Sequence, residues 1–155
     1  MIVLYCLPDS ELGGVQVRAL GIARHFETRE DIEVILGSPR NSTGGGWLES
    51  KVKAAGIRHM SFGYPSRPRK PNTVSNVIWD CYYLLGVIPG IVQVTRSMHE
   101  QEVDVVHVNG LLNVIPAVAG KVMGRPVVWH LIGTVYPSWL VAVMRQIIAW
   151  LADEV

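Results

Sequence analysis

The feature that most constrains this chain is a regular alternation of strand-like and helix-like segments along its whole length. Short apolar runs bounded by turn residues are typical of strands buried on both faces, and apolar residues three and four apart indicate helices. The strand-like segments are residues 1–8, 32–38, 57–63, 103–110 and 125–133. The helix-like segments are residues 14–27, 47–56, 74–102, 113–124 and 137–152. This order predicts an α/β domain, a Rossmann-like, doubly wound parallel sheet with helices on both faces in three layers.

Glycine and proline residues mark the ends of some of these segments and interrupt one of them. Gly56 and Gly124 stand where a helix is expected to stop, as C-terminal caps. Pro89 and Gly90 lie inside the segment 74–102, which predicts a kink there or a division into two helices.

The loops that follow the strands carry the candidate site. In open parallel sheets, ligands bind outside the carboxyl ends of the strands, near the point where the strand order reverses. The turn at Gly13-Gly14 and the loops 108–113 and 130–136 all follow strands and therefore share that edge. Glycine is poor inside a helix, so a pair at the mouth of one suggests backbone that passes close to a neighbouring segment or to a ligand phosphate.

Length and composition exclude several classes of protein. The chain has 155 residues, about one domain, and is 49% hydrophobic and 17% charged, against a usual charged fraction of about 25%. It is apolar for its size, which implies a large core or apolar surface that meets a partner. A net charge of +1 gives no basic footprint for nucleic acid.

Cysteine usage and the N-terminal residues bear on location and metal content. Cys6 and Cys81 lie far apart, and no cysteine or histidine spacing suggests a metal site. Cys6 is expected to be a buried free thiol. The first apolar run ends at Pro8 and no basic residue precedes it, so we expect no signal peptide and a cytoplasmic location. No uncharged apolar run reaches the roughly 18 residues of a spanning helix.

Two common nucleotide-binding motifs are absent. A nicotinamide dinucleotide site needs GxGxxG in the first loop and an acidic residue about 20 residues later, but here the second strand ends "LGSPRN". An NAD-dependent oxidoreductase is therefore disfavoured. No Walker A motif is present, which excludes P-loop chemistry.

Three stretches together resemble a known family. The segment "PDSELGGVQVRALGIARHF" resembles the first loop and helix of GT-B glycosyltransferases with a family 4-like N-terminal domain. The segments "GIARHFETREDIEVILGSP" and "VDVVHVNGLLNVIPAVAGKVMGRPVVWHLIG" are similar to two later stretches of that domain, in the same order. The chain departs from the family in "VHVNG" and "WHLIG", which leaves the acceptor open.

The resemblance implies roles for six residues. It makes His130 the active-site histidine beside the transferred sugar. It places Gly13, Gly14 and Gln16 at the donor diphosphate, and Asn109 and Gly110 at the acceptor. It implies a retaining, metal-independent transferase with no cofactor and a nucleotide-diphosphate sugar as substrate. The structural alternatives are a tight turn for the glycine pair and a hydrogen-bonded core residue for His130. His107, inside its strand, is expected to be structural.

The resemblance also implies what this half requires. The acceptor-side domain needs a C-terminal donor-binding domain as its partner, and "ADEV" stands where a further strand is expected to begin. We therefore expect the chain alone to transfer no sugar. The alternative is a non-catalytic Rossmann-like module that binds a phosphorylated small molecule or a protein.

Two features bear on membrane contact. The segment "SRPRK" at 66–70 is interpreted as a solvated loop, with contact to anionic headgroups or a lipid-phosphate acceptor as the functional alternative. Two aromatic sets are interpreted as core faces, with a peripheral position on the inner membrane as the alternative. They are Trp79, Tyr82, Tyr83, Leu84 and Leu85, and Trp139, Leu140, Val143, Ile147 and Trp150.

Overall fold

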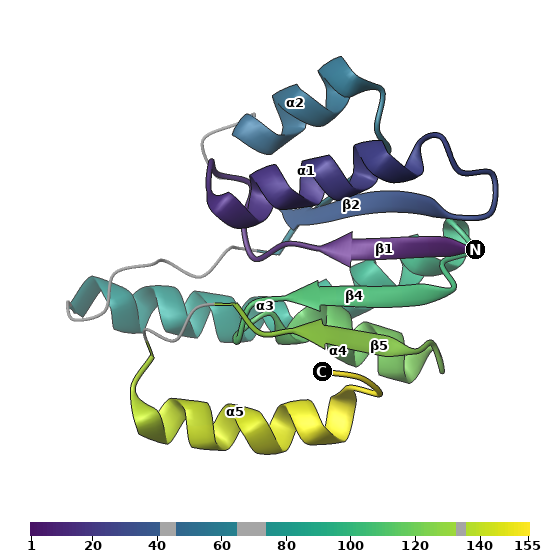
Figure 1. The fold of residues 1–155 in the computed structure, drawn as a ribbon. Coiled ribbons are helices and arrows are strands. Elements are labelled where there is room, and N and C mark those ends of the chain that lie inside the picture. The colour runs from purple at the N-terminus through teal and green to yellow at the C-terminus, as the bar shows by residue number, and fades with distance from the viewer. Residues whose placement is uncertain (41–45, 65–73, 133–135) are drawn as a thin grey trace.

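The computed structural model describes residues 1–40, 46–64, 74–132 and 136–155, and the side chains of 74–84 are outside that description. Within it, five strands and five helices alternate as the sequence predicts (Figure 1). The strands are β1 (Ile2–Cys6), β2 (Glu33–Pro39), β3 (His59–Phe62), β4 (Val105–Asn109) and β5 (Val127–His130). The helices are α1 (Gly14–Phe26), α2 (Trp47–Ala55), α3 (Val74–Glu100), α4 (Val114–Val122) and α5 (Ser138–Leu151).

The five strands form one parallel sheet in the order β3-β2-β1-β4-β5, which confirms the predicted fold class. The chain winds outward from β1 to β3, then crosses to β4 on the other side of β1. The strand order therefore reverses between β1 and β4, and a ligand crevice is expected at their carboxyl ends. Cys6 pairs with Val108 there, and Asn109 pairs with His130.

Two apolar layers bury the sheet. One joins Leu4, Val106 and Trp129 to buried residues of α3, α4 and α5. The other joins Tyr5 and Leu36 to α1 and α2. Side chains alternate between the faces of a strand, so Tyr5, His107 and His130 point to the α1 side while their neighbours fill the larger core. Figure 1 shows α1 and α2 on one side of the sheet and α5 on the other.

The glycine caps are confirmed, but the proline in α3 does not divide it. Gly56 and Gly124 adopt positive φ angles of 73° and 64° after α2 and α4. By contrast, α3 is one helix of 27 residues with Pro89 inside it, which excludes the division into two helices and leaves the predicted kink as the other alternative. Pro89 removes the hydrogen bond to the Leu85 carbonyl, and because Leu85 is 78% exposed, water can replace that bond.

The aromatic set on α5 is divided between core and solvent. Leu140 and Ile147 pack on the larger core, whereas Trp139 and Trp150 are 67% and 73% exposed and Val143 is also exposed. The interpretation of all five as a core face was therefore wrong. The helical period explains it, because residues 139, 143 and 150 lie on the face opposite the buried Met144, Ile148 and Leu151. The basic segment 66–70 and most of the set on α3 lie outside the described side chains.

Residues after α5 return to the sheet beside β5. Glu154 forms a parallel bridge with Val128, and the Trp129 N–H donates to the Glu154 carbonyl at 2.8 Å. This is an isolated bridge outside the named strands, so the expected further strand at "ADEV" stays a prediction. In the described part of the chain, no helix combines the length and the hydropathy needed to cross a bilayer.

Candidate functional site

The start of α1 is open and carries no capping side chain. Gly13 has an extended backbone with φ −162°, which any residue can adopt, so the turn itself does not require glycine there. A Cβ added to Gly14 would meet no heavy atom of the described residues within 4 Å. No side chain caps the helix and no acidic residue occupies its first turn. The first N–H groups of α1 therefore have no capping side chain and no acidic residue of their own turn beside them, which favours an anion at the helix start.

Gln16 ties the start of α1 to the loop that follows β1. Its Nε2 donates to the Asp9 carbonyl at 3.2 Å and to the Asp9 carboxylate at 2.8 Å. The side chain is buried, and its Oε1 accepts no hydrogen bond from the described residues. A buried acceptor without a donor costs about 1–3 kcal/mol, so this oxygen is a candidate ligand contact as well as a local defect.

Asn109 anchors the polar face between β1 and β4. It is fully buried, and its Oδ1 accepts a hydrogen bond from the Tyr5 hydroxyl at 3.1 Å. Its Nδ2 donates to the Cys6 carbonyl at 3.2 Å and lies 3.3 Å from His107 Nδ1. Because an amide nitrogen can only donate, His107 Nδ1 accepts and the ring proton sits on Nε2. Asn109 therefore acts through its neighbours, and its predicted contact with an acceptor stays a prediction.

His107 lies between Tyr5 and His130. Its ring stacks on Tyr5 with centroids 4.3 Å apart, and its centroid is 6.0 Å from that of His130. Burial, together with His130 and the Arg18 charge, lowers the pKa of His107 to about 4. Burial also raises the pKa of Tyr5. The expectation of a structural histidine holds for its packing, but the ring also borders the candidate site.

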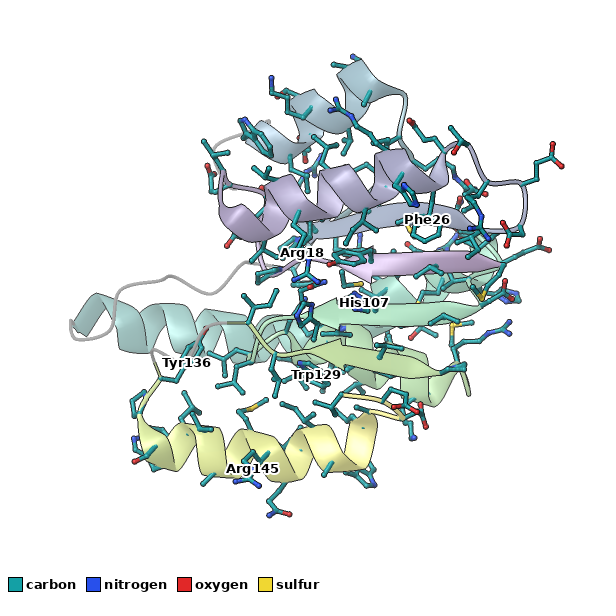
Figure 2. All side chains as sticks on the ribbon, in the orientation of Figure 1. Arg18, Phe26, His107, Trp129, Tyr136 and Arg145 are labelled. Carbon is teal, nitrogen blue, oxygen red and sulfur yellow. The ribbon has the colours of Figure 1, made fainter. Side chains whose placement is uncertain are left out.

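His130 and Arg18 meet at the carboxyl edge. Arg18 Nη1 lies 3.5 Å from His130 Nε2, although the two residues are 112 positions apart in sequence. Partial burial and the Arg18 charge both lower the pKa of His130. Figure 2 shows Arg18 extending from α1 toward His107, above the ends of β1 and β4. We call Tyr5, Arg18, His107, Asn109 and His130 the edge cluster.

Arg18 is the site residue that the sequence analysis missed. A signal for it exists, because Arg18 follows Gly14 by four positions and therefore lies above it on the same face of α1. The sequence alone does not reveal that His130 lies opposite this face.

Gly110 connects the ends of β4 and β5. It has a φ of 88°, in the left-handed region that favours glycine. Its N–H donates to the His130 carbonyl at 3.0 Å, and its carbonyl accepts from Trp129 Nε1 at 2.9 Å. These bonds fix the backbone that carries His130, so Gly110 supports the site, and its contact with an acceptor stays a prediction. Cys6, beneath this loop, is a buried free thiol, as expected, and burial raises its pKa.

The described residues contain no group of three or more histidine, cysteine, aspartate and glutamate side chains placed to hold a metal ion.

Another histidine, His59, lies on the β2–β3 side of the sheet, outside the edge cluster. Ser38 Oγ is 3.0 Å from His59 Nε2, and Glu49 is close enough to influence the His59 charge. We call Ser38 and His59 the closed pair, because Ser38 is 0% exposed and no nucleophile can be reached there.

Comparison with solved structures identifies the fold. No protein-family model and no curated protein matches the chain. The solved structure of MurG from Acinetobacter baumannii aligns over 98% of this chain and 39% of its own, with 15% identity and a TM-score of 0.63. UDP-GlcNAc 2-epimerase from Neisseria meningitidis bound to UDP-GlcNAc aligns over 99% and 39%, with 14% identity and a TM-score of 0.63.

A third structure gives the same result. A glycosyltransferase from Rickettsia africae aligns over 89% of this chain and 32% of its own, with 16% identity and a TM-score of 0.60. The chain thus has the GT-B-like, Rossmann-like fold of one domain of these proteins, and it spans less than half of their length. At these identities the likeness establishes the fold and leaves the activity to be argued from the site.

Proposed function

We propose that this chain is the acceptor-side, N-terminal half of a retaining glycosyltransferase with a family 4-like domain. It would move a sugar from a nucleotide-diphosphate sugar to a glycan or a lipid-linked acceptor. The proposal includes a C-terminal donor-binding half, without which the chain transfers no sugar. Its context is the fold shared with a glycosyltransferase and with an epimerase whose structure contains UDP-GlcNAc.

The observation that carries the proposal is the contact between Arg18 and His130. Arg18 lies one turn after Gly14, so its 3.5 Å contact with His130 brings the ring close to the first turns of α1. A diphosphate at the helix start and a sugar beside His130 would then occupy one crevice. Had the glycine turn and His130 lain on opposite sides of the sheet, the proposal would have no site.

The chemistry follows from where charge develops. In a retaining transfer, the bond between the sugar C1 and the diphosphate oxygen breaks and a bond from the acceptor oxygen to C1 forms on the same face. The acceptor proton passes to the departing diphosphate, and no protein nucleophile is needed. Uncapped N–H groups at the start of α1 favour the negative charge on the leaving group, as does the nearby Arg18 guanidinium.

His130 would serve as a hydrogen-bonding group. A guanidinium only donates, so the contact with Arg18 makes Nε2 the acceptor and leaves the ring proton on Nδ1. The lowered pKa keeps the ring neutral at pH 7. A neutral ring with a fixed tautomer can position a sugar hydroxyl without adding charge. In this proposal Gln16 contacts the diphosphate side of the ligand, and Asn109 and Gly110 support the acceptor side.

The test begins with the reading frame after codon 155. The proposal expects it to encode a second βαβ domain, and a frame that closes at once supports the non-catalytic module instead. The two halves together should transfer sugar from a nucleotide-diphosphate donor, and NMR of the product should show the donor's anomeric configuration. His130→Ala should lower the rate by about 100-fold, and His59→Ala by less than about threefold.

Three results would contradict the proposal. Turnover by the 155-residue chain alone would refute the need for a second half. An inverted product would refute the retaining mechanism. A product epimerised at the sugar, with no transfer to any acceptor, would make this chain part of an epimerase.

A further inference from the structure

The charge of Arg18 has no ionic partner among the described residues. None of the ion pairs among the described residues involves Arg18, and no carboxylate belongs to the cluster. Arg18 is exposed, and its one recorded side-chain contact is with the neutral acceptor His130 Nε2. A guanidinium carries five N–H donors in a rigid fork, so this contact leaves donors that can bind an anion.

The rings beside Arg18 add two further donors. Asn109 fixes His107 with its proton on Nε2, and Arg18 fixes His130 with its proton on Nδ1. Both rings are half-buried, at centroids 6.0 Å apart, and both belong to strands that end at the same edge. The cluster thus combines one permanent cation with two neutral donors, a composition suited to an oxyanion.

We propose that Arg18 binds an anionic group of the ligand, a phosphate or a carboxylate, and that this binding allows His130 to take up a proton. This inference deepens the proposed function, on which it rests for the statement that the ligand is a substrate of sugar transfer. The group lies at His130, one turn of α1 away from the glycine turn proposed for the diphosphate. The site would therefore accept a substrate with a negative charge next to the transferred sugar.

Electrostatics links the two events. Among residues 1–40, 46–64, 85–132 and 136–155, the titratable groups facing His130 are Arg18 from α1 and His107 from β4, with Tyr5 from β1 behind His107. Residues 133–135, outside the described part, are Gly, Thr and Val and do not titrate. Among these described groups Arg18 is the one that is charged at pH 7, and its charge opposes a proton on His130. An anion on Arg18 cancels that field and favours the imidazolium, which would in turn bind the same anion.

The experiment is an NMR titration of the histidine ring nitrogens in the 155-residue chain between pH 5 and 8. Sodium sulfate is the first probe, because it stays a dianion over this range, and sodium chloride at equal ionic strength is the control. The expected result is a rise of about 0.5 to 1 unit in the His130 pKa with sulfate, as one nearby charge is neutralised. His59, far from Arg18, should not respond.

Variants identify the residue responsible. Arg18→Ala should bring the His130 pKa toward 6.5 without sulfate and abolish the sulfate response, whereas Arg18→Lys should keep part of it. Arg145→Ala is the matched control, because Arg145 is an exposed arginine on α5, away from the cluster (Figure 2). Unchanged spectra for residues outside the edge cluster show that each variant is folded.

Further probes separate the possible sources of the anion. At pH 7, methyl phosphate and acetate at equal ionic strength should each be compared with chloride. A response to methyl phosphate alone assigns a phosphate, and a response to acetate alone assigns a carboxylate. No response of His130 to any anion overturns the inference, as does a response that survives in Arg18→Ala. These titrations use no sugar nucleotide, so their failure is distinct from a failure of the proposed transfer.

Discussion

Two regions of the same sheet each place a histidine against polar partners, yet only one has the character of a site. In the edge cluster, His130 is half-buried, contacts a cation and ends β5, which lies next to β4 on one side of the point where the strand order reverses. In the closed pair, Ser38 is completely buried against His59 on the β2–β3 side of the sheet. A serine, a histidine and a nearby glutamate suggest hydrolase chemistry until burial is considered.

The difference shows what makes polar residues functional. The hydrogen bond of the closed pair satisfies both partners and stabilises the β2–β3 pairing. The edge cluster leaves a cation and oriented ring donors unmatched in a place that a ligand can reach. An unmatched, accessible charge is a better indication of binding than a familiar set of residue types.

The largest expected effect concerns the anchor of the edge cluster. Asn109→Ala leaves the Tyr5 hydroxyl and His107 Nδ1 without their partner and removes one of the donors to the Cys6 carbonyl, and should lower the free energy of unfolding by about 3 kcal/mol. Asn113→Ala is the matched control, because Asn113 donates only one recorded bond, of 3.4 Å to the Cys6 carbonyl, and should cost about 1 kcal/mol. Equal costs in urea denaturation would contradict the central role of Asn109.

The second prediction concerns pH. The pKa of His107 falls from 6.5 to about 4 on folding, so the unfolded chain binds the proton more tightly. Stability is therefore complete above pH 6.5 and declines as the pH falls toward 4, by roughly 2 kcal/mol after allowance for solvent screening. His107→Phe keeps an aromatic ring against Tyr5 and should remove most of this slope.

The closed pair contributes to the same pH profile. Burial also lowers the pKa of His59, against the opposing influence of Glu49, so its contribution has the same sign. The slope that remains in His107→Phe combines the contribution of His59 with that of His130, whose pKa is also lowered. Denaturation midpoints at pH 4, 5, 6 and 7 would show it, and an undiminished slope in His107→Phe would contradict the assignment to the edge cluster.

A smaller effect tests whether the closed pair is inert. Ser38→Ala removes one hydrogen bond to His59 and should cost about 1 kcal/mol in unfolding free energy. Because Ser38 is buried, a serine-reactive fluorophosphonate should not label it in the folded protein. Mass spectrometry that finds the label on Ser38 would show that the pair is open and would erase the difference between the two regions.

The smallest expected effect compares two glycines of α1. Neither Gly14 nor Gly21 has a described heavy atom within 4 Å of an added Cβ. Gly21→Ala should stabilise the protein by up to about 1 kcal/mol, and Gly14→Ala by somewhat less, because Gly14 lies at the helix start. Thermal unfolding checks both. A loss of stability in Gly14→Ala would mean that the glycine pair serves the turn and is not reserved for a ligand.

Local patterns in the sequence were sufficient for the fold. The alternation of strand-like and helix-like segments predicted all ten elements and the parallel sheet. Gly56 and Gly124 indicated two helix ends, where the structure gives both residues a positive φ. The interpretation of α5 failed because it assigned aromatic residues to the core by residue type alone. The helical period places Trp139 and Trp150 on the solvent-exposed face of α5.

The site was less accessible to sequence reasoning. Gly13, Gly14 and His130 were placed at one edge by topology alone, because strands of a parallel sheet end together. The contact of Arg18 with His130 depends on β4 and β5 lying beyond β1, which no local pattern specifies. The burial of Asn109 was also missed, because a polar residue at a strand end resembles a ligand contact until its partners Tyr5 and Cys6 are known.

Calorimetry of nucleotide-sugar binding tests the central claim most directly, with this chain joined to the C-terminal half that the proposal requires and with Gly14→Ala and Gly21→Ala compared. If open backbone at the start of α1 meets a diphosphate across a crevice from His130, binding requires both halves. It should then weaken by about tenfold or more in Gly14→Ala and stay unchanged in Gly21→Ala. Equal binding by the two variants, or full binding by the 155-residue chain alone, would contradict the account.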